Sequence, residues 1–176
     1  IKMNSYSVLV VEDEKEICDG VGIYLKNQGY KVFKAYNGIE GLEIIEKEKI
    51  HIAIVDIMMP KMDGITMVMK LREHHDFPVI MLSAKSEEMD KIMGLNIGAD
   101  DYVTKPFNPM ELIARVNSQL RRYAKYLSIL KSNEKNSNIY SVGGLELNTD
   151  TKEVTVDGEP VKMTPKEFNI LHLLMK

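Results

Sequence analysis

The sequence predicts an α/β fold, an open doubly wound domain with a five-stranded parallel sheet, followed by part of a smaller domain with an antiparallel sheet. Two observations predict the first domain: short apolar runs alternate with amphipathic segments, and those runs are almost continuously apolar. Parallel strands covered by helices on both faces have this pattern. A third observation separates the domains, because KSNEKNSN at 131–138 contains no apolar side chain.

Five strands and five helices are expected in the first domain. The strands are the β-branched runs YSVLVV, YKVFKA, IHIAIVD, PVIML and DYVT. Helical periodicity begins near Glu14, Gly38, Gly64, Glu87 and Pro109. The last pattern continues in steps of three and four through Leu127 and Leu130, so the fifth helix is expected to extend to about 130.

The second domain has shorter strands and clear turn signals. NTD and DG turns separate its strands and favour antiparallel hairpins. Thr164 then supplies an N-cap, Pro165 the first helical position and Glu167 the capping-box partner of a helix. The expected organisation is a first domain at 1–123, a linker at 124–138 and a second domain at 139–176.

Composition excludes several classes of protein. The chain is 44% hydrophobic and 28% charged, with a formal net charge of −3, which gives no general attraction to nucleic acid or anionic membranes. No apolar run approaches the roughly 20 residues of a membrane span, and no secretory signal is visible. We therefore expect a cytoplasmic protein that does not enter a membrane.

Polar side chains gather where the predicted strands end. Glu12 and Asp13 follow the first strand, Asp56 ends the third, Ser83 the fourth, and Lys105 follows the fifth. In a parallel sheet all of them lie at one edge, where such folds bind ligands. Two carboxylates about 4 Å apart repel by roughly 4 kcal/mol at an effective dielectric near 20. Three of them therefore require protons or a shared cation, and oxygen ligands with open positions suit Mg²⁺.

These residue types also indicate a reaction. An aspartate held beside a metal ion can act as a nucleophile towards phosphorus, as carboxylates do in aspartyl-phosphate enzymes. The cation and Lys105 would spread the charge that develops on the transferring phosphoryl oxygens. The sequence has no glycine-rich phosphate loop of the GxGxxG or GxxxxGK type, which argues against nucleotide binding.

Four segments in order carry a family resemblance. VVEDE, VDIMMPKMDG, the Ser83-Ala84 pair and GADDYVTKPFNPMEL resemble a bacterial two-component response regulator, with a CheY-like (flavodoxin-like) receiver domain from about Tyr6 to Arg122. GADDYVTKPF and the later GGLELNTDTKEVTVDGEPVKMTPKEF resemble the OmpR/PhoB branch, whose effector is a winged helix. Residues 139–176 would be a truncated N-terminal part of that effector, without the recognition helix and wing that contact DNA.

The resemblance implies roles for individual residues. Asp56 would accept a phosphoryl group from a sensor histidine kinase, and Mg²⁺ would be held by Glu12, Asp13, Asp56 and the main-chain carbonyl of Met58. Ser83 would bond a phosphoryl oxygen, and Lys105 would pair with it across a cis Lys105-Pro106 bond. Ser83 and Tyr102 would form the switch. The residues that would pair in a phosphorylation-dependent homodimer are Lys91, Asp100, Asp101, Glu111, Arg115 and Arg122.

Three functions remain open at this stage. The first is a regulator, not an enzyme, that controls transcription at promoter DNA when it is phosphorylated. The second is a Mg²⁺-dependent phosphatase or phosphotransferase that turns over an aspartyl-phosphate. Such an enzyme needs a nearby general acid, whereas Ile57 and Met58 follow Asp56. The third is a stand-alone receiver that acts through protein contacts, against which the second-domain hairpins argue.

Overall fold

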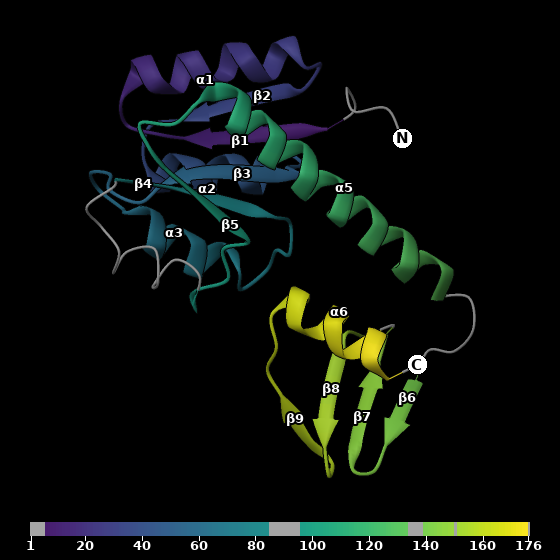
Figure 1. Cartoon of the computed structure of the whole chain (residues 1–176). Coiled ribbons are helices and arrows are strands. Elements are labelled where there is room, and N and C mark those ends of the chain that lie inside the picture. Colours follow the sequence, from purple (N-terminus) through teal and green to yellow (C-terminus); the bar gives the residue numbers. More distant parts are fainter. Residues whose placement is uncertain (1–5, 85–95, 134–138, 150, 176) are drawn as a thin grey trace. The chain divides into compact units, whose positions relative to one another are not determined.

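The computed structural model describes residues 6–84, 96–133, 139–149 and 151–175 (Figure 1). The chain forms two compact units. The first contains Ile1–Leu71 and Phe77–Arg121, and the second contains Arg72–Asp76 and Arg122–Lys176. The helix expected near Glu87 lies outside the described residues.

The first unit is built on a parallel sheet. Its strands are β1 (Ser7–Val11), β2 (Lys31–Ala35), β3 (Ile52–Asp56), β4 (Val79–Ala84) and β5 (Asp101–Lys105). They lie in the order β2-β1-β3-β4-β5, and every neighbouring pair is parallel. The predicted five-stranded doubly wound sheet is confirmed, and the chain order reverses between β1 and β3.

Helices cover both faces of this sheet. The described ones are α1 (Lys15–Asn27), α2 (Gly38–Lys47), α3 (Gly64–Leu71) and α5 (Pro109–Asn133). Strand side chains alternate between the two faces. Val8 and Val10 of β1 pack in one core cluster with residues of α1 and α5, whereas Gly41 of α2 lies beside Val11 and Met67 of α3. Helices α1 and α5 therefore cover one face, and α2 and α3 cover the other.

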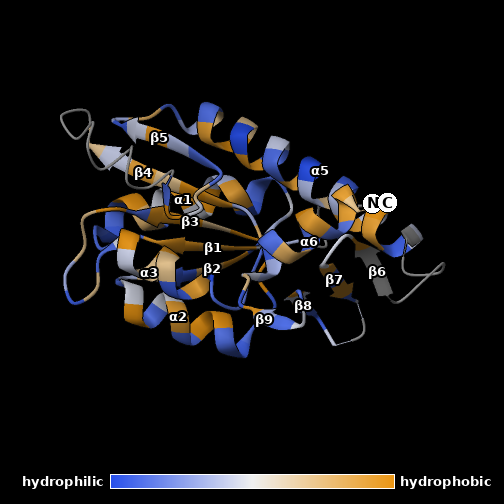
Figure 2. Ribbon diagram, turned by 90° about the horizontal axis from the view of Figure 1, so that it is seen from below, coloured by the Kyte–Doolittle hydropathy of each residue, from blue (hydrophilic) through white to orange (hydrophobic). Residues whose placement is uncertain are grey.

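Burial explains why the strand sequences are so apolar. All five residues of β3 are buried, and four of the five in β1 are buried. Figure 2 shows β1 and β3 as hydrophobic along their length, while α2 and α5 alternate hydrophobic and hydrophilic residues. The strands thus have apolar neighbours on both faces, and each helix has one face towards solvent.

Helix α5 is longer than expected. It continues to Asn133, beyond the predicted end near 130. The core of the first unit includes Leu112, Ile113, Val116 and Leu120 of this helix, each at most 4% exposed. From Arg122 the helix belongs to the second unit. None of the helices in the described ranges combines the length and apolar content needed to cross a bilayer.

The second unit contains a small antiparallel sheet and one helix. Its elements are β6 (Ile139–Val142), β7 (Leu145–Asn148), β8 (Glu153–Val156), β9 (Glu159–Val161) and α6 (Pro165–Leu174). The strands pair in sequence order, and Leu147, Val154 and Phe168 form the buried core. This confirms the predicted hairpins.

Two local signals of the second unit are also confirmed. Asp157 and Gly158 have positive φ angles of 52° and 86°, as a tight hairpin turn requires. The amide of Glu167 donates to the Thr164 hydroxyl oxygen at 3.2 Å, and that hydroxyl donates to the Glu167 carboxylate at 3.0 Å. Pro165 follows Thr164 at the start of α6.

Candidate functional site

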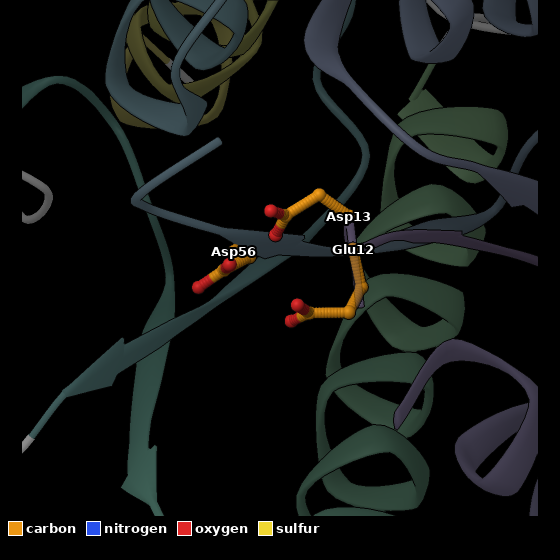
Figure 3. Close-up of side chains that lie close together, drawn as sticks. All are labelled: Glu12, Asp13 and Asp56. Atoms are coloured by element: carbon orange, nitrogen blue, oxygen red, sulfur yellow. The ribbon is translucent and has the colours of Figure 1, made fainter. Parts of the chain in front are cut away.

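Three carboxylates meet at the carboxyl edge of the parallel sheet. Glu12 and Asp13 directly follow β1, and Asp56 is the last residue of β3. Their ligand oxygens all lie within 4.8 Å of one another, and Figure 3 shows the three side chains extending to the same side. The cluster lies between the two strands at which the chain order reverses, where ligands bind in folds of this class.

The backbone fixes Glu12 and brings its charge inside the protein. Its amide donates to the carbonyl of Ala35 on the neighbouring chain segment at 3.0 Å, and its side chain is fully buried. One carboxylate oxygen accepts a hydrogen bond from the amide of Glu14 at 3.2 Å. Asp56 is also buried, at 5% exposure, whereas Asp13 is exposed. The cluster therefore has one side open to solvent.

Lys105 brings the one positive charge that contacts these carboxylates in the described ion pairs. Its Nζ lies 2.9 Å from Glu12 Oε2 and 3.3 Å from Asp56 Oδ1. Strand β5 places it there because Lys105 is in register with Ala84 at the end of β4. The Lys105-Pro106 peptide bond is cis, as predicted.

Burial changes the acidity of this cluster. It raises the pKa of Asp56 to about 7, an effect that the Glu12 charge adds to and Lys105 opposes. The pKa of Glu12 is also raised, mainly by burial and against the effect of Lys105. Burial alone would lower the pKa of Lys105, but the two carboxylates raise it. Lys105 thus stays charged and only partly compensates the acidic groups.

The donor set fits a divalent cation. Carboxylate oxygens are the ligands that Mg²⁺ and Ca²⁺ prefer, and Mg²⁺ keeps several waters when one or two carboxylates bind it. Asp13 is exposed while Glu12 and Asp56 are buried, so an ion bound here would have protein oxygens on one side and water on the other. That arrangement leaves coordination positions free for a phosphoryl oxygen.

The comparisons with known proteins agree with this geometry. Residues 8–117 match the family described as response regulator receiver domain. The chain is 49% identical over 170 residues to regulatory protein VanR of Enterococcus faecium, a match that covers 97% of this chain and 72% of VanR. The chain belongs to the response regulators. It is also 45% identical to regulatory protein VanRc of Enterococcus gallinarum, over 98% of this chain and 74% of that protein.

Solved structures place this response regulator in the OmpR/PhoB branch. The response regulator DrrB of Thermotoga maritima, an OmpR/PhoB homologue, superposes with a TM-score of 0.61 at 30% identity, covering 97% of this chain and 72% of DrrB. A CheY-like receiver domain protein from Methanospirillum hungatei has a TM-score of 0.64 at 32% identity, covering 68% of this chain and 97% of that protein. The named relatives are regulatory proteins, as expected for a chain that is not an enzyme.

The other expected site residues occupy different positions. Ser83 is fully buried near the end of β4, and its hydroxyl donates to the carbonyl of Ala84 at 3.1 Å. The side chain of Met58 is 61% exposed beyond β3. Tyr102 is half-buried in β5, and its amide donates to the Asp101 carboxylate at 2.8 Å. The roles of these three residues in phosphorylation stay predictions.

Three of the residues expected at a dimer interface contact one another within this chain. Arg115 donates to both carboxylate oxygens of Asp101 at 2.8 and 2.9 Å and lies 3.2 Å from Glu111. The Asp100 carboxylate accepts from the amide of Val79 at 2.9 Å. Arg122 is exposed on α5, and Lys91 lies outside the described residues. The interface stays a prediction.

One residue that contacts the site was not identified as important from the sequence. Gly64 begins α3, and a Cβ atom there would lie 2.1 Å from the carbonyl oxygen of Asp56. Only glycine fits so close to the end of β3. The sequence predicts Gly64 as a helix start and includes it in the VDIMMPKMDG segment, but neither signal shows the close approach to Asp56.

Proposed function

We propose that this response regulator accepts a phosphoryl group on Asp56 from a sensor histidine kinase and controls transcription in that state. One observation carries the proposal: Asp56 lies at a sheet edge with two further carboxylates and within 3.3 Å of the Lys105 ammonium. A structural ion pair would need one carboxylate for one ammonium, whereas this edge has three. The excess of acidic oxygens is what a cation and a phosphoryl group together would use.

In the proposed reaction, a carboxylate oxygen of Asp56 attacks the phosphorus atom of a phosphohistidine. The new P–O bond forms as the P–N bond breaks, and the histidine nitrogen leaves with the electron pair. Lys105, which already contacts Asp56, would pair with a phosphoryl oxygen. The Ser83 hydroxyl would exchange its bond to the Ala84 carbonyl for another phosphoryl oxygen, and Tyr102 would follow it inwards as the second switch residue.

Mg²⁺ is the cofactor that this donor set favours. Glu12, Asp13 and Asp56 would hold it, together with the Met58 carbonyl, and bound Mg²⁺ would neutralise charge on the phosphoryl oxygens. Glu12 keeps a hydrogen bond from the Glu14 amide and an ion pair with Lys105, so we expect it to contribute through a water molecule.

The second unit supports a transcriptional output. Its four-stranded sheet and capped helix α6 match the start expected for a winged-helix effector, a class of domain that would contact promoter DNA through its recognition helix. The relatives VanR and VanRc are named regulatory proteins. A regulator that reads DNA would act in the cytoplasm, and the domains would lie at 1–123 and 139–176 with a linker between them.

The test is to incubate the chain with acetyl phosphate and Mg²⁺ and to measure its intact mass. We expect one acid-labile phosphoryl group per chain, absent from Asp56→Asn. The matched control is Asp63→Asn, because Asp63 is an exposed carboxylate in the same loop whose side chain caps α3 at Thr66, a role that asparagine can also fill. Full labelling of Asp56→Asn, or continuous release of phosphate over many turnovers, would contradict the proposal.

A further inference from the structure

The loop after Asp56 is attached to a helix outside the site. Residues 57–63 join β3 to α3, and the carbonyl of Met62 accepts a hydrogen bond from the amide of Gly38 at 3.3 Å. Gly38 is buried and is the first residue of α2. Its amide is one of the first-turn donors that have no partner inside their own helix. The loop therefore supplies a carbonyl cap to α2, and α2 in turn holds the loop.

The start of α2 is itself fixed by side chains. The Asn37 side-chain oxygen accepts from the amide of Glu40 at 3.0 Å, and the Glu40 carboxylate accepts from the amide of Tyr36 at 2.7 Å. Asn37 is therefore the N-cap of α2, and Glu40 accepts from the amide of the residue before that cap, so two side chains fix the first turn. The direction of the Gly38 amide is thus set by its own helix, so the helix determines where Met62 lies.

There is no space for a side chain between Gly38 and the loop. A Cβ atom on Gly38 would lie 2.9 Å from Cγ of Met62, 3.0 Å from its carbonyl oxygen and 3.1 Å from its Cβ. Two of these atoms, the oxygen and Cβ, are part of the backbone or attached directly to it. A methyl group at Gly38 must therefore displace the loop backbone as well as the end of a flexible side chain.

The rest of the loop is also held by backbone hydrogen bonds, so it cannot easily adjust to a displacement of Met62. The amide of Gly64 donates to the carbonyl of Ile57 at 2.9 Å, which closes the other end of the loop. Within it, the amide of Met62 donates to the carbonyl of Pro60 at 2.7 Å, and Lys61 has a left-handed φ of 67°. A shift of Met62 is thus passed to the residues between Ile57 and Pro60.

We propose that Gly38 is a positioning residue for the metal site. It would set the β3–α3 loop, and with it the Met58 carbonyl, from a helix that has no residue in the acidic cluster. This inference rests on the proposed function, because the metal-binding role of the Met58 carbonyl belongs to that proposal. The distinctive expectation is that Mg²⁺ affinity responds to Gly38 while the stability of the fold does not.

Gly38→Ala tests this role in the full chain. The φ angle of Gly38 is outside the left-handed range, and alanine has a higher helix propensity than glycine. The melting temperature of the variant should therefore equal that of the parent. Calorimetric titration should show Mg²⁺ binding weakened by about tenfold, as for other residues that act through a ligand. In the metal-free protein, hydrogen exchange of the 57–63 amides should rise.

Gly41→Ala is the matched control one turn further along α2. A Cβ there would lie 2.7 Å from Cε of Met67 and 3.1 Å from both Sδ of Met67 and Cγ2 of Val11. All three are side-chain atoms outside the loop, so Mg²⁺ affinity and loop exchange should stay as in the parent. Normal Mg²⁺ binding by the parent with unchanged affinity and exchange in Gly38→Ala would overturn the positioning role alone. If the parent bound no Mg²⁺, the proposed function would fall and this role with it.

Discussion

Lys105 is the residue on which the charge balance of the site depends. One ammonium contacts Glu12 at 2.9 Å and Asp56 at 3.3 Å, while Asp13 adds a third carboxylate to the same cluster. Without a cation the edge keeps an excess of negative charge, which is unfavourable in a partly buried position. The folded chain thus carries a local cost that binding of a cation or uptake of a proton would relieve.

The raised pKa of Asp56 predicts a pH-dependent effect of one substitution. The pKa of Asp56 is about 7 in the folded chain, whereas the ordinary value for an aspartate is 3.8. Folding therefore favours the protonated carboxyl. The stability that this form supports is complete below the unfolded pKa and is lost as pH rises through about 7. Without Mg²⁺, Asp56→Asn should therefore be close to the parent in stability near pH 4, exceed it increasingly as pH rises to about 7, and keep a constant advantage above that pH.

Urea unfolding of both proteins at several pH values measures this difference. The variant must be measured beside the parent because His51 and His75 have lowered pKa values, which make the folded state more stable as pH rises. In a measurement of the parent only, this trend would oppose the effect of Asp56. Both proteins contain the two histidines, so it cancels in the difference. Adding Mg²⁺ at pH 8 should stabilise the parent more than the variant. A difference in unfolding free energy that stays constant from pH 5 to pH 8 would refute the assignment of Asp56 as the titrating group.

At the scale of the elements, the caps of short helices determine where the functional loops begin. Asn37 is buried at 5% exposure and caps α2. Asn37→Ala should lower the unfolding free energy by about 1 kcal/mol because the Glu40 amide loses its acceptor. Asn37→Ser, which keeps an acceptor oxygen, should retain most of the stability in the same denaturant titration. Equal losses in both variants would show that packing around Asn37 matters more than the cap.

Local signals predicted the elements well. The apolar strand runs, the helix starts at Gly38 and Gly64, and the capping box from Thr164 to Glu167 all depend on neighbours within a few residues. The meeting of Glu12, Asp13 and Asp56 followed from parallel topology, which brings strand ends to one edge. For these features a pattern along the chain contains the physical cause.

Contacts between distant segments could not be predicted in this way. Gly38 and Met62 meet only because the β2–α2 and β3–α3 connections lie at the same edge of the folded sheet. The pairing of Arg115 with Asp101 depends on how α5 crosses β5. The continuation of α5 from 131 to Asn133 consists of polar residues without apolar periodicity, so no hydrophobic pattern signals it. There the Ser132 hydroxyl donates to the carbonyl of Ile129 at 2.8 Å.

At the scale of the whole molecule, assembly depends on charges that are already paired. Arg115 contacts Asp101 and Glu111 of its own chain, with 38% of its side chain exposed. A two-fold interface along β5 and α5 would repeat every contact twice and offer these groups partners on the second chain. Exposed pairs are worth only about 0–1 kcal/mol each. The unphosphorylated chain should therefore associate weakly, and phosphorylation should favour the dimer.

Arg115→Glu tests this arrangement by reversing one charge in each copy. The new glutamate would face Asp101 and Glu111 within the chain and their equivalents across the interface. Because the two-fold axis doubles each change, dimerisation should weaken by about tenfold or more. Sedimentation with and without beryllofluoride, a phosphoryl mimic, measures this: the parent should shift from monomer to dimer, and Arg115→Glu should stay largely monomeric.

Lys26→Glu makes the same charge change at an exposed position near the end of α1 and should dimerise like the parent. A parent that stays monomeric with the mimic, or an Arg115→Glu variant that dimerises equally well, would place the interface elsewhere or remove it.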